Sequence, residues 1–337
     1  MVNIVLIGAT SDIARRRHLA GLTQAKSANM YGFFARTAEK VVPLAEQYGV
    51  KAFTDLEDVW NDKNVDAVLI CTPTPSHSEI AVAALKAGKH VLCEKAMAIS
   101  TEQARAVVDA VKESGKKFMM LHVQRRYAPH LEAKRLLDNG EIGKLLSYRT
   151  YLGVGGAPGF NRGAIPAWKN AVAELGSHRI DLMRYFTGSD MKRVFGFITD
   201  LNPAVNGNVG DNCMVIAEHE NGVIGQMHFA RTSYNGNDRS TVLFGTEGSI
   251  TIYAETHELL VEKKNKTRTV YQFPGAHEQS TLELTDLHEL FCRCIEEDTK
   301  PVITARDGLA CMCTIDAIQK SARTGAWVTV ENPGNDD

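Results

Sequence analysis

Residues 91–98 read Val-Leu-Cys-Glu-Lys-Ala-Met-Ala, an apolar, β-rich run that ends in a lysine beside a glutamate. In a parallel sheet, the carboxyl ends of the strands open onto the crevice where ligands bind. A lysine at such an end can reach a substrate oxygen or the ribose of a bound nucleotide. An ordinary Glu-Lys pair leading into the helix expected at Thr101–Ser114 explains the same letters. The order of elements on both sides of this run decides between the two interpretations.

Strands and helices alternate through the first part of the chain. Short apolar runs predict strands at 3–8, 30–37, 65–71, 89–93 and 118–122. Periodic stretches at 39–48, 78–87 and 101–114 predict helices between them, and Gly88 and Gly115 end the last two. This alternation predicts an α/β fold with a doubly wound parallel sheet of the Rossmann type.

The turn after the first strand has the features of a pyrophosphate cradle. Gly8 ends the strand and a helix starts near Arg15, so free backbone N–H groups and the helix dipole would face an anion. Of the three glycines in G-x-G-x-x-G only Gly8 is present, and the turn is one residue longer than the common form. Thr10 and Ser11 can donate hydroxyl hydrogen bonds to phosphate in partial compensation.

The second strand ends in Ala35-Arg36-Thr37, without the acidic residue that binds the ribose hydroxyls in NAD-preferring sites. An arginine there can pair with a 2′-phosphate, and Thr37 offers a second donor. The pattern therefore favours NADP over NAD, although a solvated arginine at a strand end would look the same.

Length and composition limit the number of domains and the classes of function that the chain can have. A chain of 337 residues predicts two domains, and a net charge of −2 argues against nucleic-acid binding. No apolar run is long enough for a membrane span, and Met1–Ile4 enters a strand at once, which leaves no room for a signal peptide. The seven cysteines lie in apolar or periodic segments without zinc-like spacing. They predict reduced core thiols, a cytoplasmic location and no metal site.

From Leu145 onwards the chain becomes β-rich, with turns such as Glu220-Asn221-Gly222, which predicts one large, mainly antiparallel open sheet. The expected strands are 146–153, 193–201, 212–220, 223–231, 240–244, 249–253 and 259–263. Helices at 175–186, 282–296 and 305–321 would cover one face, so the other face needs cover as well. The Gly- and Pro-rich stretch 153–168 would be a loop that can close over a substrate. We therefore expect a dinucleotide-binding domain at 1–122 and a substrate-binding and oligomerisation α+β domain at 123–330.

Several longer motifs occur in a fixed order. They are Cys-Thr-Pro-Thr at 71–74 with His77, Ala-Gly-Lys-His-Val-Leu-Cys-Glu-Lys at 87–95, Gln-Arg-Arg-Tyr at 124–127, Gly-Glu-Ile-Gly at 140–143, Glu-Leu-Gly-Ser-His-Arg-Ile-Asp at 174–181 and Ser-Ala-Arg-Thr-Gly-Ala-Trp-Val at 321–328. Together they resemble the Gfo/Idh/MocA oxidoreductase family, typified by glucose–fructose oxidoreductase and inositol dehydrogenase. The resemblance spans nearly the whole chain. It implies an NAD(P)-dependent oxidoreductase acting on a secondary alcohol of a sugar, polyol or related molecule. It also implies a homodimer or homotetramer formed through the C-terminal sheet.

The segment 174–181 could carry the chemistry. Glu174, His178 and Asp181 are spaced i, i+4 and i+7, which places them on one stripe of a helix. An imidazole beside a carboxylate can remove a hydroxyl proton while hydride leaves the same carbon, although such a pair is more often a surface pair. In the family a histidine here is the usual base, the residue four before it assists, and the lysine of a Glu-Lys-Pro motif binds the reacting oxygen. The matching residues are His178, Glu174 and Lys95.

The turn sequence and the resemblance together give the full set of expected contacts. The residues expected to bind the cofactor are Gly8, Thr10, Ser11, Asp12, Ile13, Arg36, Thr37, Cys71, Thr72, Pro73, His77, Glu94, Lys95 and Gln124. The residues expected to contact the substrate are Lys95, Arg126, Tyr127, Asn161, Arg162, Trp168 and His178.

Two positions depart from the family pattern. Glu174 replaces the usual aspartate, and Ala96 replaces the proline after the lysine. Because a cis peptide costs about 2.5–4 kcal/mol without proline, either the bond after Lys95 is trans and the lysine is displaced, or the cis form is tolerated. Two other functions stay open: a redox-assisted, NAD-dependent glycosidase, and a non-catalytic cofactor-sensing regulator, which the two departures favour slightly.

Overall fold

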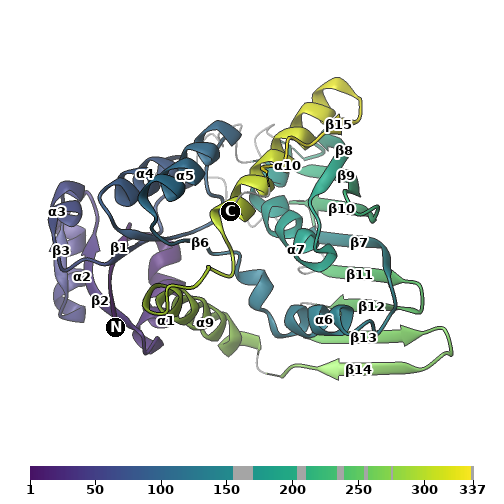
Figure 1. The fold of residues 1–337 in the computed structure, drawn as a ribbon, viewed down its shortest axis with the longest axis horizontal. Coiled ribbons are helices and arrows are strands. Elements are labelled where there is room, and N and C mark those ends of the chain that lie inside the picture. Colours follow the sequence, from purple (N-terminus) through teal and green to yellow (C-terminus); the bar gives the residue numbers. More distant parts are fainter. Residues whose placement is uncertain (155–169, 203–209, 234–238, 254–256, 275, 335–337) are drawn as a thin grey trace. The chain divides into compact units, whose positions relative to one another are not determined.

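A computed structural model describes residues 1–154, 170–202, 210–233, 239–253, 257–274 and 276–334, without the side chains of 276–280. The chain forms two compact units, each built around its own sheet (Figure 1). The first consists of Met1–Arg126 with His277–Leu309, and the second of Tyr127–Ala276 with Ala310–Asp337. Within the described residues, no helix has the length and apolarity needed to cross a membrane.

The first unit contains a six-stranded sheet in the order β3-β2-β1-β4-β5-β6, with every neighbouring pair parallel. Its strands are β1 (Val2–Ile7), β2 (Ala28–Phe34), β3 (Lys51–Phe53), β4 (Ala67–Ile70), β5 (His90–Cys93) and β6 (Phe118–Met120). The order reverses between β1 and β4, the position at which doubly wound sheets bind dinucleotides. The predicted Rossmann fold is confirmed.

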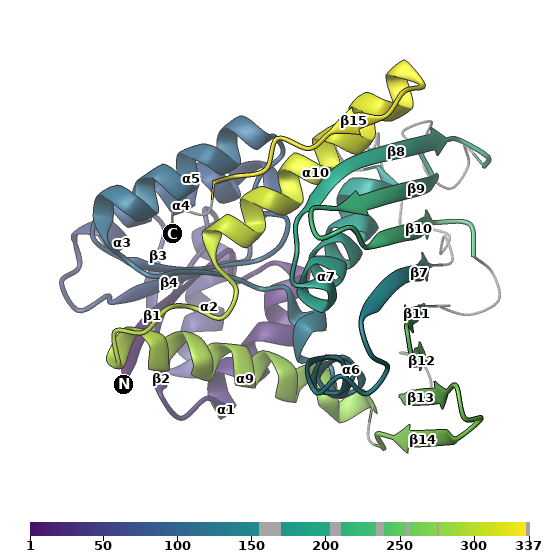
Figure 2. The same ribbon diagram turned by 45° about the vertical axis from the view of Figure 1, so that its right-hand side comes forward.

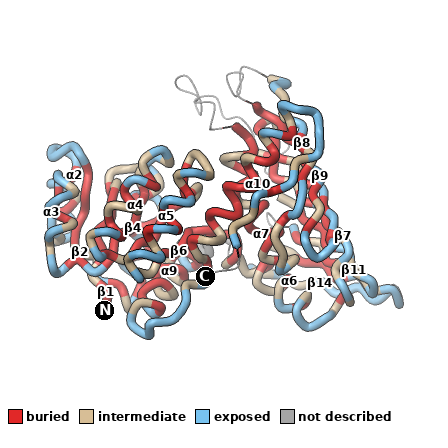
Figure 3. The backbone as a smooth tube through the Cα atoms, turned by 45° about the horizontal axis from the view of Figure 1, so that its top comes forward, coloured by how far each residue is buried: buried red, intermediate tan, exposed pale blue. Residues whose placement is uncertain are grey.

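Helices cover both faces of this sheet, as the continuous apolar runs in β1 and β4 require. Two helices, α4 (His77–Lys86) and α5 (Thr101–Ser114), pack together on one face, and α1 (Leu19–Gln24) lies beside α9 (Ala276–Glu296) on the other (Figure 1). The remaining helical elements are η1 (Ala14–His18), α2 (Ala38–Tyr48), α3 (Leu56–Asn61), η2 (Thr74–Ser76) and η3 (Val123–Arg126). The strands between these layers are mostly buried (Figure 3).

The second unit contains a nine-stranded sheet in the order β14-β13-β12-β11-β7-β10-β9-β8-β15. Its strands are β7 (Leu145–Gly153), β8 (Met191–Thr199), β9 (Asn212–His219), β10 (Ile224–Ala230), β11 (Ser240–Gly245), β12 (Gly248–Tyr253), β13 (Glu258–Lys263), β14 (Arg268–Gln272) and β15 (Val328–Thr329). Among the described strands of this sheet, only β7 and β10 pair in parallel, so the prediction of a mainly antiparallel sheet is confirmed.

Helices of the second unit lie against one face of this sheet (Figure 2). The helix α6 (Ala128–Asp138) packs on β12 and β13, whereas η5 (Val172–Gly176) and α7 (Ser177–Thr187) pack on β10 and β7. The helix α10 (Ala305–Thr324) approaches β8, where Gly196 leaves room for Ile318.

The prediction that helix 282–296 covers this sheet is wrong. That helix forms most of α9, which belongs to the first unit, where Gly21 of α1 brings the backbone against His288. The unpredicted α6 covers part of the second sheet instead. An amphipathic pattern shows that a helix has an apolar face, but not which surface will cover that face.

The other face of the nine-stranded sheet carries apolar side chains that none of the described helices of this unit covers. Phe197, Met214, Ile216, Ile224 and Phe244 are between 41% and 60% exposed. Strand pairing places Phe197 opposite Met214, so these residues adjoin across neighbouring strands. An apolar face of this extent is typical of a surface that another protein covers.

All seven cysteines are buried free thiols, as expected for core residues. In the described part of the chain, no group of three His, Cys, Asp or Glu side chains could hold a metal ion.

His219 shows how the core of the second unit constrains an ionisable group. The imidazole is fully buried, with Tyr148 Oη 3.0 Å from Nε2 and the Ser189 carbonyl oxygen 3.0 Å from Nδ1. These contacts suit a neutral ring that donates from Nδ1 to the carbonyl and accepts from the tyrosine hydroxyl. Burial lowers the pKa of His219 to about 4.

We expect this burial to make the protein less stable as the pH falls from about 6.5 towards 4. In the unfolded chain the imidazole binds a proton below its ordinary pKa of about 6.5, whereas the native state keeps it neutral. The unfolded state therefore holds more protons in this window, which contributes up to ~1.4 kcal/mol per pH unit. Urea unfolding between pH 7 and pH 5 would measure the loss, and His219→Gln should show a shallower pH dependence. An equally steep loss in the variant would contradict the assignment.

Candidate functional site

The first turn of the first unit is built by Gly8 at the end of β1. Its φ of +82° is one that other residues rarely adopt, and a Cβ atom here would lie 2.9 Å from Thr72 Cγ2. Gly8 N–H donates to the Phe34 carbonyl at 2.9 Å, which ties the turn to the end of β2. Because Gly8 has no side chain, the ends of β1, β2 and β4 can lie close together at this turn.

Ser11, expected to donate to phosphate, and Asp12, expected to bind the cofactor, both have partners within the protein. The Ser11 hydroxyl donates to the Cys71 carbonyl at 2.9 Å and accepts from Ala14 N–H at 3.3 Å. Its hydroxyl proton therefore joins two strand-end turns instead of pointing to a ligand. Asp12 pairs with Arg16 at 2.7 Å on the exposed side of the helix start. Phosphate binding at this turn would therefore depend on Thr10 and the backbone N–H groups.

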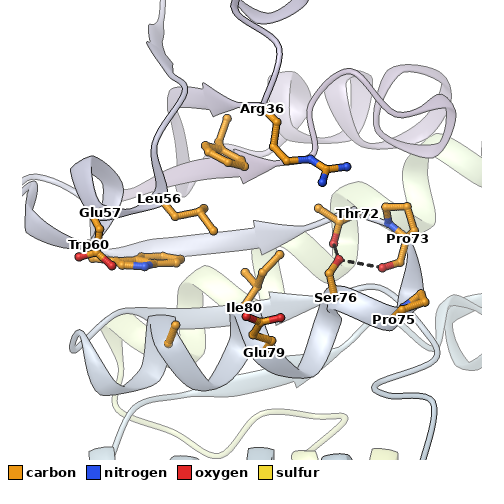
Figure 4. A pocket seen from close by; sticks show the side chains of 12 residues that line it. Arg36, Leu56, Glu57, Trp60, Thr72, Pro73, Pro75, Ser76, Glu79 and Ile80 are labelled. Atoms are coloured by element: carbon orange, nitrogen blue, oxygen red, sulfur yellow. Dashed lines mark hydrogen bonds between the residues drawn. The ribbon is translucent and has the colours of Figure 1, made fainter.

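A cavity of about 510 Å³ opens beside the ends of β2 and β4 (Figure 4). Phe34, Leu56, Trp60 and Ile80 give it apolar walls, and its polar lining residues are Arg36, Glu57, Thr72, Ser76 and Glu79. The Arg36 guanidinium points towards the Thr72 side, whereas Glu57 lies beside Trp60 at the other end (Figure 4). Among the described residues, no carboxylate forms an ion pair with Arg36. The cavity combines a flat apolar surface with a cation, and these two features suit an adenosine and an anionic group.

His77 joins this cavity wall to the segment after β5. Its Nε2 lies 2.7 Å from the Thr72 carbonyl oxygen and its Nδ1 lies 2.8 Å from the Ala96 carbonyl oxygen. The ring is buried, and burial lowers its pKa. Both ring nitrogens of His77 contact backbone carbonyls, and its cofactor role stays a prediction. The Cys71 side chain is also fully buried, and this residue offers its carbonyl to Ser11.

Lys95 follows β5 at the carboxyl edge of the sheet, and the buried Glu94 fixes its backbone. Glu94 Oε2 accepts from Lys95 N–H at 3.0 Å, and Oε1 lies 2.9 Å from His18 Nε2. Burial works to raise the pKa of Glu94, but the hydrogen bond and charge of His18 and the charge of Lys95 outweigh it and lower the pKa to about 2. Glu94 is therefore an ionised anchor. The peptide bond between Lys95 and Ala96 is cis, which is the second of the two expected backbone states.

The remaining residues expected in the site have these positions. Gln124 is buried in η3, and Arg126 pairs with Asp286 at 2.5 Å. Tyr127 stacks on His130 with ring centroids 5.5 Å apart. The substrate residues expected at Asn161, Arg162 and Trp168 lie outside the described residues.

In the second unit, Glu174 and His178 lie on either side of a change in helix type. Glu174 belongs to the π-helix η5, and His178 to the first turn of α7. Both are partly exposed, whereas Asp181 is buried. His178 and Asp181 lie three positions apart in α7, so the expected common stripe applies to this pair. A π-turn holds more residues than an α-turn, so the α-helical spacing rule does not apply across this junction. The Glu174 carboxylate forms an ion pair with Arg231, which directly follows β10.

Comparison with known proteins places this geometry in a family. Residues 2–122 match a family model described as "Oxidoreductase family, NAD-binding Rossmann fold", and residues 130–251 match the "GFO/IDH/MocA C-terminal domain". The chain belongs to the GFO/IDH/MocA oxidoreductase family. Its first unit is therefore an NAD-binding Rossmann domain.

Several members of the GFO/IDH/MocA family resemble the chain over most of its length. It is 30% identical to 1,5-anhydro-D-fructose reductase of Ensifer adhaerens, over 97% of this chain and 98% of the relative. It is 29% identical to scyllo-inositol 2-dehydrogenase (NAD(+)) of Bacillus subtilis (strain 168), over 86% and 84%. Among solved structures, levoglucosan dehydrogenase in complex with NADH and levoglucosan superposes with a TM-score of 0.87 at 25% identity, covering 98% of this chain and 100% of the other.

Sequence reasoning about this GFO/IDH/MocA member missed two residues that hold the site together. His18 lies in a run of arginines that reads as a solvated helix face, yet it is fully buried against Glu94. Arg231 ends a strand pattern and is 4% exposed. Alternation along β10 could have shown that Arg231 faces the helix layer, but no pattern in the sequence indicates its partner.

Proposed function

We propose that this GFO/IDH/MocA member is an NAD(P)-dependent oxidoreductase that transfers a hydride between a nicotinamide cofactor and a secondary alcohol or ketone of a sugar, polyol or related small molecule. The observation that carries the proposal is the buried Glu94 that holds Lys95 at the carboxyl edge of an NAD-binding Rossmann sheet. Support also comes from relatives named as a sugar-derivative reductase and an inositol dehydrogenase.

In this proposal the protein's own groups bind and deprotonate the alcohol. The Lys95 ammonium donates to the reacting oxygen, and His178 accepts the hydroxyl proton as a general base. Glu174 orients and tunes His178. The bound nicotinamide supplies the hydride acceptor, which leaves these residues with proton transfer and positioning.

His178→Ala should lower kcat by ~10²–10⁴, because general base catalysis typically contributes that much. Nicotinamide binding should be unchanged, since the histidine does not belong to the Rossmann domain. A panel of sugars and polyols, followed by the absorbance of the reduced nicotinamide, identifies the substrate for this measurement. The proposal fails if the wild-type protein binds no nicotinamide, or if turnover of an identified substrate survives the substitution.

The residues around the Gly8 turn and the cavity suit a dinucleotide. A Cβ at Gly8 would fill the space between the turn and Thr72, and the adjoining cavity has room for an adenosine between Leu56, Trp60 and Ile80. We propose that Arg36, with Thr37, binds a ribose 2′-phosphate and so favours NADP over NAD. The support is an exposed guanidinium at the end of β2, without an ion-pair partner in the part of the chain described.

Arg36→Ala should weaken NADP binding about 10- to 100-fold, which corresponds to the loss of a charge-assisted hydrogen bond of about 1.5–3 kcal/mol. NAD binding should change less than about threefold, because NAD carries no 2′-phosphate. Calorimetric titration with both cofactors measures the difference, and Arg16→Ala is a control in the same domain. An equal loss of affinity for NADP and NAD would show that Arg36 does not bind the 2′-phosphate.

We further propose that residues 1–122 bind the dinucleotide, and that residues 123–330 bind the substrate and form the subunit contact. The partner is a second copy, in a homodimer or homotetramer, on the exposed face that carries Phe197, Met214 and Ile216. The seven buried thiols suit a reducing compartment, and cell fractionation would test the cytoplasm as the location.

Phe197→Glu should lower the molar mass in solution to that of a monomer, because a carboxylate in an apolar interface is costly to bury. Light scattering after size exclusion at micromolar concentration measures this mass. Val302→Glu, which alters an exposed apolar side chain of the first unit, should leave the assembly intact. A monomeric wild-type protein, or an unchanged mass for Phe197→Glu, would exclude this face as the contact.

A further inference from the structure

Arg231 is held in a fixed place by the strand that precedes it. Met227 and Phe229 of β10 are fully buried towards the helices, and Arg231 continues this alternation with 4% exposure. Its backbone N–H donates to the Asp211 carbonyl at 2.9 Å, and the preceding Ala230 carbonyl accepts from Val154 N–H at 2.9 Å. The backbone is therefore anchored on both sides where the arginine leaves the sheet.

Gly176 brings the Glu174 helix close to this arginine. A Cβ at residue 176 would lie 2.9 Å from Phe229 Cε2, so only a glycine allows η5 to pack this closely on β10. Glu174 lies two residues before Gly176, and Arg231 lies two residues after Phe229. The close contact thus brings the carboxylate and the guanidinium together into their ion pair.

We infer that Arg231 is a positioning residue for the catalytic helix, and that it acts through the Glu174 carboxylate. A buried arginine needs a counter-ion, since leaving one partner of a buried pair alone typically costs 3–5 kcal/mol. The pair therefore holds the Glu174 carboxylate in a fixed direction. It also offsets most of the glutamate's negative charge near His178, one turn further along the chain.

The ion pair gives the carboxylate at position 174 a partner that directly follows the neighbouring strand β10. The inference rests on the proposed function only for the role of His178, because the ion pair itself belongs to the structure.

Other charged groups surround this turn and must stay constant in a test. Within the described residues of this unit they include Arg179, Asp181, Asp211 and Arg239. Asp211 is turned to its own loop, because its carboxylate accepts from the N–H groups of Leu201 and Asn202. Arg179 donates to the Arg239 carbonyl at 2.8 Å. These contacts of Asp211 and Arg179 are made to groups other than the Glu174 carboxylate, and each single substitution at residue 231 or 174 removes one charge.

The test is the titration of His178 by NMR in protein with 13C-labelled histidine, with the signal assigned through His178→Gln. Arg231→Gln should raise the titration midpoint by roughly 0.5–1 pH unit, because the Glu174 charge is no longer offset. Glu174→Gln should lower it by a similar amount, because the arginine charge is then uncompensated. The double variant, and Arg231→Lys, should return within roughly 0.3 pH unit of the wild type.

Arg184→Gln is the matched control, since Arg184 lies on α7 like His178 and is also buried. Its guanidinium pairs with Asp190 at 2.6 Å. This substitution should lower thermal stability without moving the His178 midpoint. Unchanged midpoints in both single variants, or an equal shift in the control, would overturn the inference. Should Arg231→Gln not fold, the double variant and Arg231→Lys still decide the question, because shifts beyond that range in both would also overturn it. The NMR titration needs no substrate. A failure of this inference can therefore be distinguished from a failure of the proposed oxidoreductase function.

Discussion

A single buried carboxylate ties the strand end that carries Lys95 to the helix after the glycine turn. Glu94 reaches His18 through one oxygen and the Lys95 N–H through the other. A carboxylate buried without partners would cost several kcal/mol, so the two contacts stabilise each other and must form together. The position of Lys95 is thereby coupled to the first helix after the Gly8 turn.

The contact between His18 and Glu94 also accounts for the π-helical start of the first helix. The turn after Gly8 is one residue longer than the common form, and in a regular α-helix the extra residue would rotate His18 by about 100° away from Glu94. The structure instead has a π-helix over Ala14–His18, in which Leu19 N–H donates to the Ala14 carbonyl. A π-turn takes up one additional residue. His18 therefore faces Glu94 while Leu19 and Leu22 stay in the core.

Much of the fold could be predicted from the sequence, because apolar runs and alternation report which faces are buried. The parallel sheet and most strands of the second sheet followed from these patterns. The edge strand β14 did not, since four of its five residues are exposed and show no alternation. In the site, Gly8 and Lys95 could be placed from local motifs. The role of Ser11 could not be predicted, because its hydroxyl donates a hydrogen bond to the Cys71 carbonyl, sixty positions further along the chain. Patterns describe a residue's own element, but they do not identify distant partners.

The second π-helix limits how the residues of a helical motif can be compared by spacing alone. If η5 were α-helical, Glu174, His178 and Asp181 would share one face, and replacing aspartate by glutamate would simply misplace a carboxylate. In the structure Glu174 belongs instead to a π-helix, and its carboxylate forms an ion pair with Arg231. The distance between helix and strand at this ion pair depends on Gly176, because a Cβ there would lie 2.9 Å from Phe229 Cε2. Glutamate at position 174 and arginine at position 231 should therefore be compared together, as an ion pair, and not one residue at a time.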